Sequence, residues 1–447
     1  MFTTGRRELK KNKMDWVLLW AVAILIFIGT IAIVSATAAL PFQARVIRTH
    51  MIALPLGVLF FVIGWGFNYQ IFQDQWKVVY GAMLALLVGV LIFGTVDRGS
   101  RAWFHLPFFS VQPSELCRVG LILVLANYLD RNAGRMKDLS SVLGALALTA
   151  PFFLLIIKQP DFSAVLVTFP TVLAMLFCAG VSFLHLSVIL GYGFIIGFFP
   201  VVWTLISLHP DWIQDSAAVR VMMSLSHFGL PALFFVLAAA GLIWFLWWFS
   251  QKFRPGLSWT CFLGAALVVI LGLFSGIMVK NEMKEYQRKR FEVFLSPETD
   301  PRGAGYNLLQ AQIAMGSGGF FGRGIFSGTQ SRLGFVPERH TDFILAVVGE
   351  EMGFAGTMAV IGLYLLMMWR IILAARVSRD QFGYLANCGI FSMFMVYLFI
   401  NFGMSVGLFP VAGIPLPLVS YGGSNLVATL WAVGIAESVY SRRYALV

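Results

Sequence analysis

The residues best suited to chemistry lie in a polar segment late in the chain, between Lys280 and Thr341. Its most distinctive stretch runs from Ser296 to Tyr306 and reads Ser-Pro-Glu-Thr-Asp-Pro-Arg-Gly-Ala-Gly-Tyr. An Asp-Pro step followed by spaced glycines is typical of a sharp turn that presents a carboxylate, here that of Asp300. Such a carboxylate can act as a general base that takes the proton from a sugar hydroxyl as it attacks an anomeric carbon. Asp-Pro turns are also common in ordinary loops, so the pattern alone leaves catalysis and a structural turn both open.

The same segment is basic and contains two glycine runs. Its basic residues are Lys280, Lys284, Arg288, Lys289, Arg290, Arg302, Arg323, Arg332 and Arg339. A cationic surface at the level of lipid headgroups suits a phosphorylated lipid, although a solvated charged loop would have the same composition. The glycines of residues 316–319 and 322–324 predict either backbone N–H groups that approach a pyrophosphate or simple loop flexibility.

The elements that must position this segment are membrane helices. Of the 447 residues, 59% are hydrophobic and 12% are charged, and the mean hydropathy is +0.82. A soluble domain is about half apolar and about a quarter charged. Apolar runs of about 18 residues or more recur along the chain, so the bilayer is the solvent that the sequence requires. The formal net charge of +11 comes from basic clusters between these runs, which favours an anionic membrane surface over nucleic acid as the partner.

The apolar runs predict twelve membrane spans, with both termini in the cytoplasm. The spans are expected at residues 16–38, 50–67, 77–95, 113–129, 139–157, 161–181, 184–207, 230–250, 258–279, 352–374, 383–407 and 419–440. The basic residues between Arg6 and Lys13 predict a cytoplasmic start. Further Lys and Arg fall in every second loop, at Arg131, Arg135, Lys137, Lys252, Arg254, Arg376, Arg379, Arg442 and Arg443. Residues 284–341 are therefore expected outside. The first apolar run has no small-residue cleavage pattern behind it and is expected to remain as an anchor.

Charged residues within or beside the spans are a second set of candidates, because a charge at membrane depth usually has a partner or a purpose. Glu115 and Arg118, three residues apart, are expected on one helical face, as a structural ion pair or as a substrate contact. Lys158 and Asp161 flank a break between two spans, where unpaired backbone can line a polar cavity. Lys158 would there face a phosphate or extend to the membrane interface.

Three further groups lie near the start of later spans. His340 and Asp342 could orient a substrate or cap the next helix. Of Glu350 and Glu351, one is expected to face a cavity while the other stays hydrated. The small residues of the stretch 420–424, Ser-Tyr-Gly-Gly-Ser, predict close helix packing or room for a bulky lipid, and packing is favoured.

The remaining polar and sulfur-containing side chains predict structural roles. Glu437, near the end of the last span, is expected to be solvated. The cysteines have no metal-like spacing and are expected to be packing residues; they are Cys117, Cys178, Cys261 and Cys388. No acidic cluster has dedicated ligand spacing, so no tightly bound metal or cofactor is expected, although a divalent cation could assist a pyrophosphate.

Several of these motifs together closely resemble the SEDS family (shape, elongation, division and sporulation). The resemblance covers nearly the whole chain, and its motifs are highly specific. They are the Asp300 turn, residues 337–344 and residues 415–424, with Arg101, Trp103, residues 112–115, 159–161 and 349–353 in addition. Residues 328–331, Gly-Thr-Gln-Ser, and the Glu-Arg-His-Thr-Asp form of residues 338–342 look like the elongation type (RodA) rather than the division type (FtsW).

The resemblance implies an all-α, polytopic peptidoglycan glycosyltransferase that polymerises lipid II for cell elongation. It would act at the outer face of the bacterial cytoplasmic membrane, by an inverting mechanism, together with a class B penicillin-binding protein. The family's essential aspartate maps onto Asp300, and the first acid position of the family pattern is Ser296 here, so Asp300 and Glu298 are the only acids in the turn. The residues expected to bind substrate are Arg101, Trp103, Glu115, Arg118, Lys158, Asp161, Tyr306, Gln310, His340, Asp342, Ser420, Gly422, Gly423 and Ser424. The undecaprenyl pyrophosphate leaving group would be stabilised by basic residues, with Arg101, Lys158, Arg288 and Arg302 as the candidates by position.

The chain departs from the family in its length between the seventh span and the Asp300 turn. We expect one transmembrane domain over residues 1–447, composed of a ten-span body, a two-span insertion at 209–283 and an extracytoplasmic catalytic loop at 284–341. Two added crossings leave the sidedness of the loop unchanged. The inserted pair would pack against lipid or form a partner surface.

Two functions of other classes also fit a hydrophobic protein with many spans. A transporter of the lipid-linked precursor predicts charges near the bilayer midplane and a pseudo-repeat between halves. The candidate residues here instead gather on one face, and no internal repeat is evident. A non-catalytic scaffold for wall-synthesis enzymes would tolerate loss of Asp300.

Overall fold

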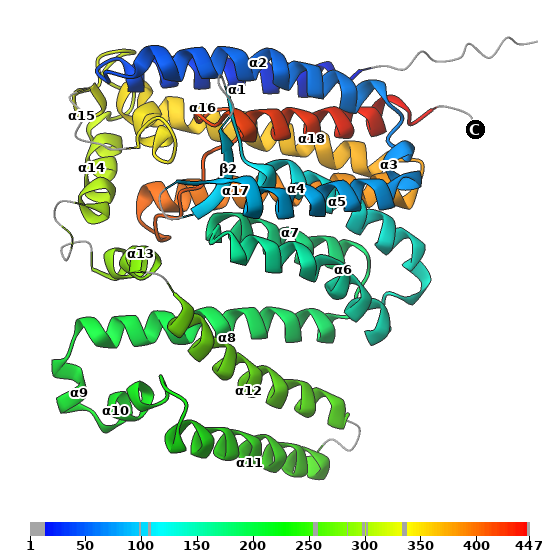
Figure 1. Cartoon of the computed structure of the whole chain (residues 1–447), viewed down its shortest axis with the longest axis vertical. Coiled ribbons are helices and arrows are strands. Elements are labelled where there is room, and N and C mark those ends of the chain that lie inside the picture. The colour runs from blue at the N-terminus through cyan, green and yellow to red at the C-terminus, as the bar shows by residue number, and fades with distance from the viewer. Residues whose placement is uncertain are drawn as a thin grey trace, which may run out of the picture. The chain divides into compact units, whose positions relative to one another are not determined.

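The computed structural model is almost entirely helical (Figure 1). It describes residues 14–97, 100–105, 109–253, 258–283, 285–296, 300, 303–332 and 338–444. The chain divides into two compact units, one formed by Met1–Gly180 with Asn307–Val447 and the other by Val181–Tyr306.

The first unit is a bundle in which segments far apart in sequence lie side by side. Its helices are α1 (Trp16–Thr37), α2 (Gln43–Gly66), α3 (Gln70–Asp74), α4 (Trp76–Phe93), α5 (Pro113–Arg131), the 3-10 turn Ala133–Arg135, α6 (Leu139–Lys158), α7 (Phe162–Cys178), α15 (Thr329–Arg332), α16 (Ile344–Arg376), α17 (Gln381–Val406) and α18 (Gly423–Ser441), together with most of α14 (Ala304–Ser317). The last helix, α18, packs along α2, and α17 packs on α5, α7 and α16. Residues from both ends of the sequence therefore build one core.

Polar side chains at the helix ends fix where several of these spans start. Asp15 precedes α1 and accepts a hydrogen bond from the amide of Leu18 at 3.1 Å. Asp380 caps α17 in the same way, accepting from the amide of Gly383 at 2.8 Å. These acceptors satisfy amides that a helix start leaves without an intrahelical partner. At the other end of α17, Gly407 has φ 83°, a left-handed conformation that suits glycine and ends the helix.

A small antiparallel sheet in the first unit departs from the all-helical expectation. Its strands are β1 (Thr95–Asp97), β2 (Ser100–His105) and β3 (Ser110–Val111), in the order β1-β2-β3. Trp103 pairs with Thr95, and Phe104 pairs with Val111. The sheet connects α4 to α5, so it fixes the backbone of Arg101 and Trp103 next to the start of α5.

The second unit contains α8 (Phe183–Leu208), α9 (Asp211–Asp215), α10 (Ala217–Ser224), α11 (Leu230–Phe253), α12 (Trp259–Glu282) and α13 (Glu285–Leu295). Its core joins α8 to α12 through Phe199, Trp203, Leu273 and Ile277, all buried. The predicted insertion lies inside this unit. The unit itself begins earlier, at Val181, because α8 packs on α12.

The polytopic helical fold expected from the sequence is confirmed, since each of the twelve predicted ranges overlaps one helix. Of the helices that the structure describes, nine are long and apolar enough to cross a membrane. Three further helices fall in the twelve predicted ranges: α7, which is shorter, and α5 and α18, which carry more polar side chains. Two predicted starts were wrong: α2 begins at Gln43 rather than 50, and α16 at Ile344 rather than 352. Both helices extend beyond their uninterrupted apolar runs, so hydropathy marks only part of each.

Candidate functional site

The Asp300 turn joins α13 to α14 in the second unit. The backbone amides of Gly303 and Tyr306 both donate to the carbonyl oxygen of Asp300, at 3.4 and 3.3 Å. The carboxylate of Asp300 folds over Gly303, where a Cβ atom would stand 2.2 Å from Oδ2. Glycine at 303 therefore leaves the space that the carboxylate occupies. Pro301 and the predicted site neighbours Glu298 and Arg302 lie outside the described residues.

A buried ionic cluster in the first unit contains the predicted pair Glu115 and Arg118. Nη1 of Arg118 donates to Oε2 of Glu115 at 2.8 Å, and the two side chains are 2% and 10% exposed respectively. The hydroxyl of Tyr397 donates to the same oxygen at 2.7 Å and accepts from Arg118. Nδ2 of Asn425 donates to Glu115 at 3.0 Å, and Nε of Arg118 donates to Thr168 at 3.2 Å. The cluster thus ties together α5, α7, α17 and α18.

Asp161 forms a second polar cluster beside this one. Its Oδ2 accepts from Nε2 of Gln112 at 2.8 Å and from Oγ of Ser114 at 3.1 Å, while its Oδ1 caps α7 by accepting from the amide of Ala164 at 3.2 Å. Oγ of Ser424 accepts from the amide of Gln112 at 2.8 Å. These bonds bring the N-terminal ends of α5, α7 and α18 to one place in the first unit.

Both clusters have the geometry of structural networks. A buried charge is costly unless it is paired and hydrogen-bonded. Glu115 and Asp161 each accept several hydrogen bonds, and these bonds leave no carboxylate oxygen of Asp161 without a donor. Of the two alternatives that the sequence left open for Glu115 and Arg118, the ion pair is present. Whether a substrate also reaches them stays a prediction.

A third group joins the two motifs at 338–344 and 415–424. The amide of Tyr421 donates to the carbonyl of His340 at 2.8 Å, and their rings lie 5.6 Å apart. Nδ2 of Asn401 donates to the carbonyls of Asp342, at 3.1 Å, and Ile414, at 2.8 Å. Oγ of Ser420 accepts from the amide of Leu416 at 2.8 Å.

The start of α16 shows whether His340 or Asp342 caps this helix, which was one of the roles predicted for them. The N-cap of α16 is Phe343, without a side-chain cap, so neither His340 nor Asp342 occupies the capping position. Beside them, Arg339 donates through Nε to the carbonyl of Ala36 at 2.6 Å, and burial lowers the pKa of its guanidinium.

The remaining predicted site residues lie in different surroundings. Arg101, exposed on β2, donates to the carbonyl of Leu91 at 3.2 Å, and Lys158 is exposed at the end of α6. The carbonyl of Trp103 accepts from Thr95, and Gln310 is half-buried on α14. A Cβ atom at Gly423 would stand 2.5 Å from the ring of Phe109, and one at Gly422 3.3 Å from Asn425. The close contact at Gly423 is with the connection between β2 and β3, so the helix packing favoured for residues 420–424 stays a prediction.

The family follows from comparison with known proteins. The family model for FtsW, RodA and SpoVE, described as cell cycle protein, matches residues 15–229 and 237–445. The chain belongs to this family. Peptidoglycan glycosyltransferase MrdB of Escherichia coli K12 is 31% identical over 393 residues, 88% of this chain and 85% of MrdB. The probable peptidoglycan glycosyltransferase FtsW of Trichlorobacter lovleyi is 30% identical over 443 residues, 97% of this chain and 95% of that protein.

Two solved structures agree with the fold. A chain from a peptidoglycan synthase complex that coordinates polymerization and crosslinking is 27% identical, with a TM-score of 0.66 over 97% of this chain and 99% of that chain. The crystal structure of Thermus thermophilus rod shape determining protein RodA is 25% identical, with a TM-score of 0.59 over 97% of this chain and 98% of that chain.

Two expectations about acidic residues of this family member were wrong. For Glu350 and Glu351 only the hydrated position was wrong: both are buried, Glu350 accepting from the amide of Gln330 at 2.7 Å and Glu351 from Oγ of Ser35, while Glu351 lines a cavity of about 130 Å³ as expected of one of the two. Glu437 is fully buried rather than solvated. It accepts from the amide of Asp15 at 2.8 Å and from Oγ of Ser441 at 3.1 Å.

Tyr397, Asn425 and Thr168 were not identified from the sequence, although they complete the Glu115 cluster. Asn425 and Thr168 carried a usable signal, since a polar side chain inside an apolar span needs a partner there. Tyr397 carried none, because tyrosine is ordinary in membrane helices. Over the described ranges, no group of three or more His, Cys, Asp and Glu side chains is arranged to hold a metal ion.

Proposed function

We propose that this chain polymerises lipid II into glycan strands, with Asp300 as the general base. The peptidoglycan glycosyltransferase class is confirmed by family membership and by the names of the curated relatives. The specific substrate, the base and the partner are the proposal. Its main support is the Asp300 turn, in which two backbone amides fix the backbone of Asp300 and a glycine leaves room for its carboxylate.

In the proposed reaction, Asp300 removes the proton from the 4-hydroxyl of the N-acetylglucosamine on the acceptor. The oxygen attacks the anomeric carbon of the donor, and a carbon–oxygen bond forms there with inversion. The bond from that carbon to the pyrophosphate breaks, and undecaprenyl pyrophosphate leaves with the electron pair. The proton ends on the Asp300 carboxyl group and passes to solvent. A base in this position typically contributes ~10²–10⁴-fold to the rate.

Basic side chains would stabilise the charge that develops on the leaving pyrophosphate. Arg101 and Lys158 are exposed in the first unit and are available for this role. Arg288, in the second unit, is 63% exposed and pairs with Glu292 at 3.0 Å. A divalent cation could share the work by bridging pyrophosphate oxygens.

We further infer an elongation role and a class B penicillin-binding protein as partner. The Gly-Thr-Gln-Ser stretch and the Glu-Arg-His-Thr-Asp motif support the elongation type. The likeness to a chain of a peptidoglycan synthase complex supports a partner that crosslinks. The expected location is the bacterial inner membrane, with both termini cytoplasmic and the Asp300 turn outside. The basic loops on alternate sides of the apolar helices support this orientation.

The experiment that tests this function is polymerisation of purified lipid II by the purified chain, with and without its class B partner. Glycan strands of increasing length, resolved by gel electrophoresis, are the expected product. Complete inactivity of a correctly folded complex would favour a scaffold. Movement of lipid II across vesicles without polymerisation would favour a transporter.

A further inference from the structure

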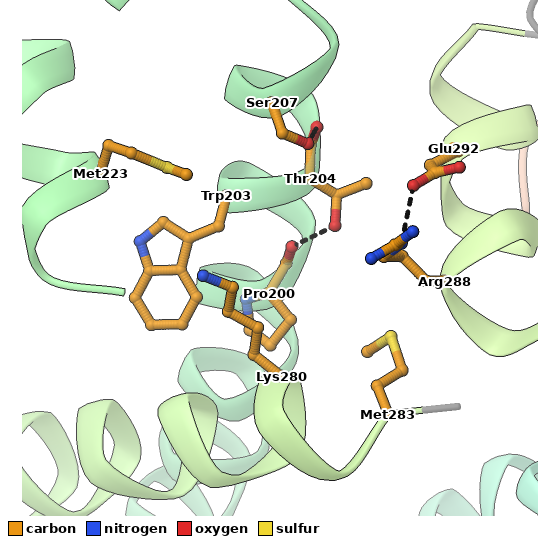
Figure 2. Close-up of a pocket in the computed structure, with 9 residues that line it drawn as sticks. All are labelled: Pro200, Trp203, Thr204, Ser207, Met223, Lys280, Met283, Arg288 and Glu292. Atoms are coloured by element: carbon orange, nitrogen blue, oxygen red, sulfur yellow. Dashed lines mark hydrogen bonds and ion pairs between the residues drawn. The ribbon is translucent and has the colours of Figure 1, made fainter. Parts of the chain in front are cut away.

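The second unit contains a cavity of about 320 Å³, and of its lining residues the proposed reaction draws only on Arg288 (Figure 2). Its volume is at the lower end of the range for small-ligand sites, about 300–1,000 Å³. The lining residues come from α8, α10, α12, α13 and the connection between α12 and α13. They are Pro200, Trp203, Thr204, Ser207, Met223, Lys280, Met283, Arg288 and Glu292.

Two basic side chains face this cavity. Lys280 lies in the last turn of α12, half-buried, with its ammonium 5.6 Å from the ring centroid of Trp203. Among the described residues, no carboxylate pairs with Lys280. Arg288 enters from α13 and binds Glu292 through Nε at 3.0 Å (Figure 2). The three charges sum to a net positive cavity, and a guanidinium has further N–H donors besides Nε.

The rest of the lining is apolar and well supported. Trp203 is buried, and its Nε1 donates to the carbonyl of Met222 at 2.9 Å, so the indole forms a fixed wall. Met223 and Met283 add flexible thioether side chains that adapt to irregular ligands. The hydroxyls of Thr204 and Ser207 already donate to helix carbonyls, at 2.8 and 2.7 Å. Donation to an anion would therefore come from Lys280 and Arg288.

We propose that this cavity binds the phosphate of a phosphate-bearing lipid, with Lys280 as the principal charged contact and Arg288 as the second. The cavity lies at the C-terminal ends of α8 and α12, two helices apolar enough to span a bilayer. Helix ends of this kind lie near the headgroup level, where tryptophan and lysine are common. A phosphate can accept charge-assisted hydrogen bonds there, while the acyl or prenyl chain follows the apolar helix surfaces. The inference concerns binding and does not depend on which residue is the catalytic base.

Native mass spectrometry of the full-length protein tests this site, with phosphatidylglycerol, a polyprenyl phosphate and inorganic pyrophosphate as separate probes. A hydrogen bond to a charged group is typically worth about 1.5–3 kcal/mol, so Lys280→Gln is expected to weaken lipid binding about tenfold or more. Lys280→Arg should retain most of the affinity.

Lys252→Gln is the matched control, because Lys252 also lies over a tryptophan, Trp248 at 4.8 Å, but outside the cavity. Binding of either lipid that depends on Lys280 and not on Lys252 supports the proposal. Equal lipid binding by the parent and by Lys280→Gln, with unchanged thermal stability, would overturn it and leave Lys280 as a lysine that extends to the interface. Lys280-dependent binding of pyrophosphate without either lipid would also contradict it, since the site would then serve a free anion.

Discussion

Glu115 makes more polar contacts in the first unit than its local sequence predicts. Its Oε2 accepts from Arg118, Tyr397 and Asn425, which lie on α5, α17 and α18. In the low-dielectric interior, an ion pair of this kind contributes little net stability by itself, but leaving one charge unpartnered is costly. Replacing only Glu115 or only Arg118 is therefore expected to be disproportionately destabilising compared with replacing both.

This asymmetry predicts the outcome of a double-mutant cycle. Glu115→Gln and Arg118→Met should each lower the stability of the purified protein by about 3–5 kcal/mol, because each strands a buried charge. The double variant should be less damaged than the sum, by an interaction energy of about 0.5–3 kcal/mol. Thermal unfolding in detergent measures these changes.

Tyr397→Phe is the milder control in the same cluster, since it removes one hydroxyl and should cost about 1–3 kcal/mol. Strict additivity of Glu115→Gln and Arg118→Met would show that the pair does not act as a unit.

For single residues, the sequence correctly predicted contacts between side chains that lie close together along the chain. The spacing of Glu115 and Arg118 placed them on one helical face, where the structure pairs them. It could not predict that Tyr397, 279 residues after Arg118, would share that pair, because no local pattern encodes the meeting of α5 and α17. The buried carboxylates of Glu351 and Glu437 were missed for the same reason, since Ser35 and Asp15, which donate to them, lie near the opposite end of the chain.

Among the elements, α16 is interrupted by Gly353, which has φ 70° and ψ −166°. The glycine-rich loop at 318–324 takes up the hydrogen bonds that the interruption frees. The amides of Arg323 and Gly324 donate to the carbonyls of Glu350 and Glu351, both at 3.0 Å. In return, the amides of Phe354 and Ala355 donate to the carbonyls of residues 319 and 320, at 2.9 and 3.0 Å. A broken helix is tolerated in a membrane protein where other segments satisfy its backbone in this way.

Gly353→Ala is therefore expected to destabilise the protein by about 1–3 kcal/mol or more. Alanine disfavours the positive φ, and its Cβ would stand 2.2 Å from the amide nitrogen of Gly322. Gly362→Ala in the same helix is the matched control, because a Cβ at Gly362 meets nothing within 4 Å. Thermal unfolding of the two variants is the measurement. Equal stabilities would mean that the interruption at Gly353 does not depend on glycine.

The structural role of the two glycine runs could not be predicted from the sequence. Their sequence predicts flexibility or pyrophosphate binding, whereas the structure uses Gly318 and Gly322 for close backbone approach to α16. Long apolar helices were predictable because hydropathy is a local property. The sheet at 95–111 was missed although Thr95, Val96 and the aromatic pair Trp103-Phe104 flank an Asp-Arg-Gly-Ser stretch, a composition typical of a hairpin.

For the whole molecule, function depends on which side of the membrane carries the Asp300 turn. A cysteine replacing Ser296 should react with a membrane-impermeant thiol reagent added to intact cells, in a background without the native cysteines. A cysteine replacing Gly134 should not react until the membrane is opened. Labelling in the opposite pattern would place the turn in the cytoplasm, away from the expected site of polymerisation.

The predicted insertion gives a separate topological expectation. If α11 and α12 are two crossings added to a ten-span body, a reporter fused near Phe253 should be cytoplasmic. An external reporter there would show that α11 and α12 do not both cross as expected. The sequence indicated extra helices at this place, but not that α8 would pack with them as one unit, because that depends on contacts such as Phe199 and Trp203 with Leu273.

Asp300→Asn in the lipid II polymerisation assay tests whether Asp300 takes the proton during glycosyl transfer. The amide keeps the size of the carboxylate and much of the turn's hydrogen bonding, but it cannot act as the base. Polymerisation should fall ~10²–10⁴-fold, while membrane insertion and partner binding stay intact. Glu298→Gln, which removes the other acid of the turn, should remain active. A near-normal rate for Asp300→Asn, or inactivity of Glu298→Gln instead, would contradict the assignment.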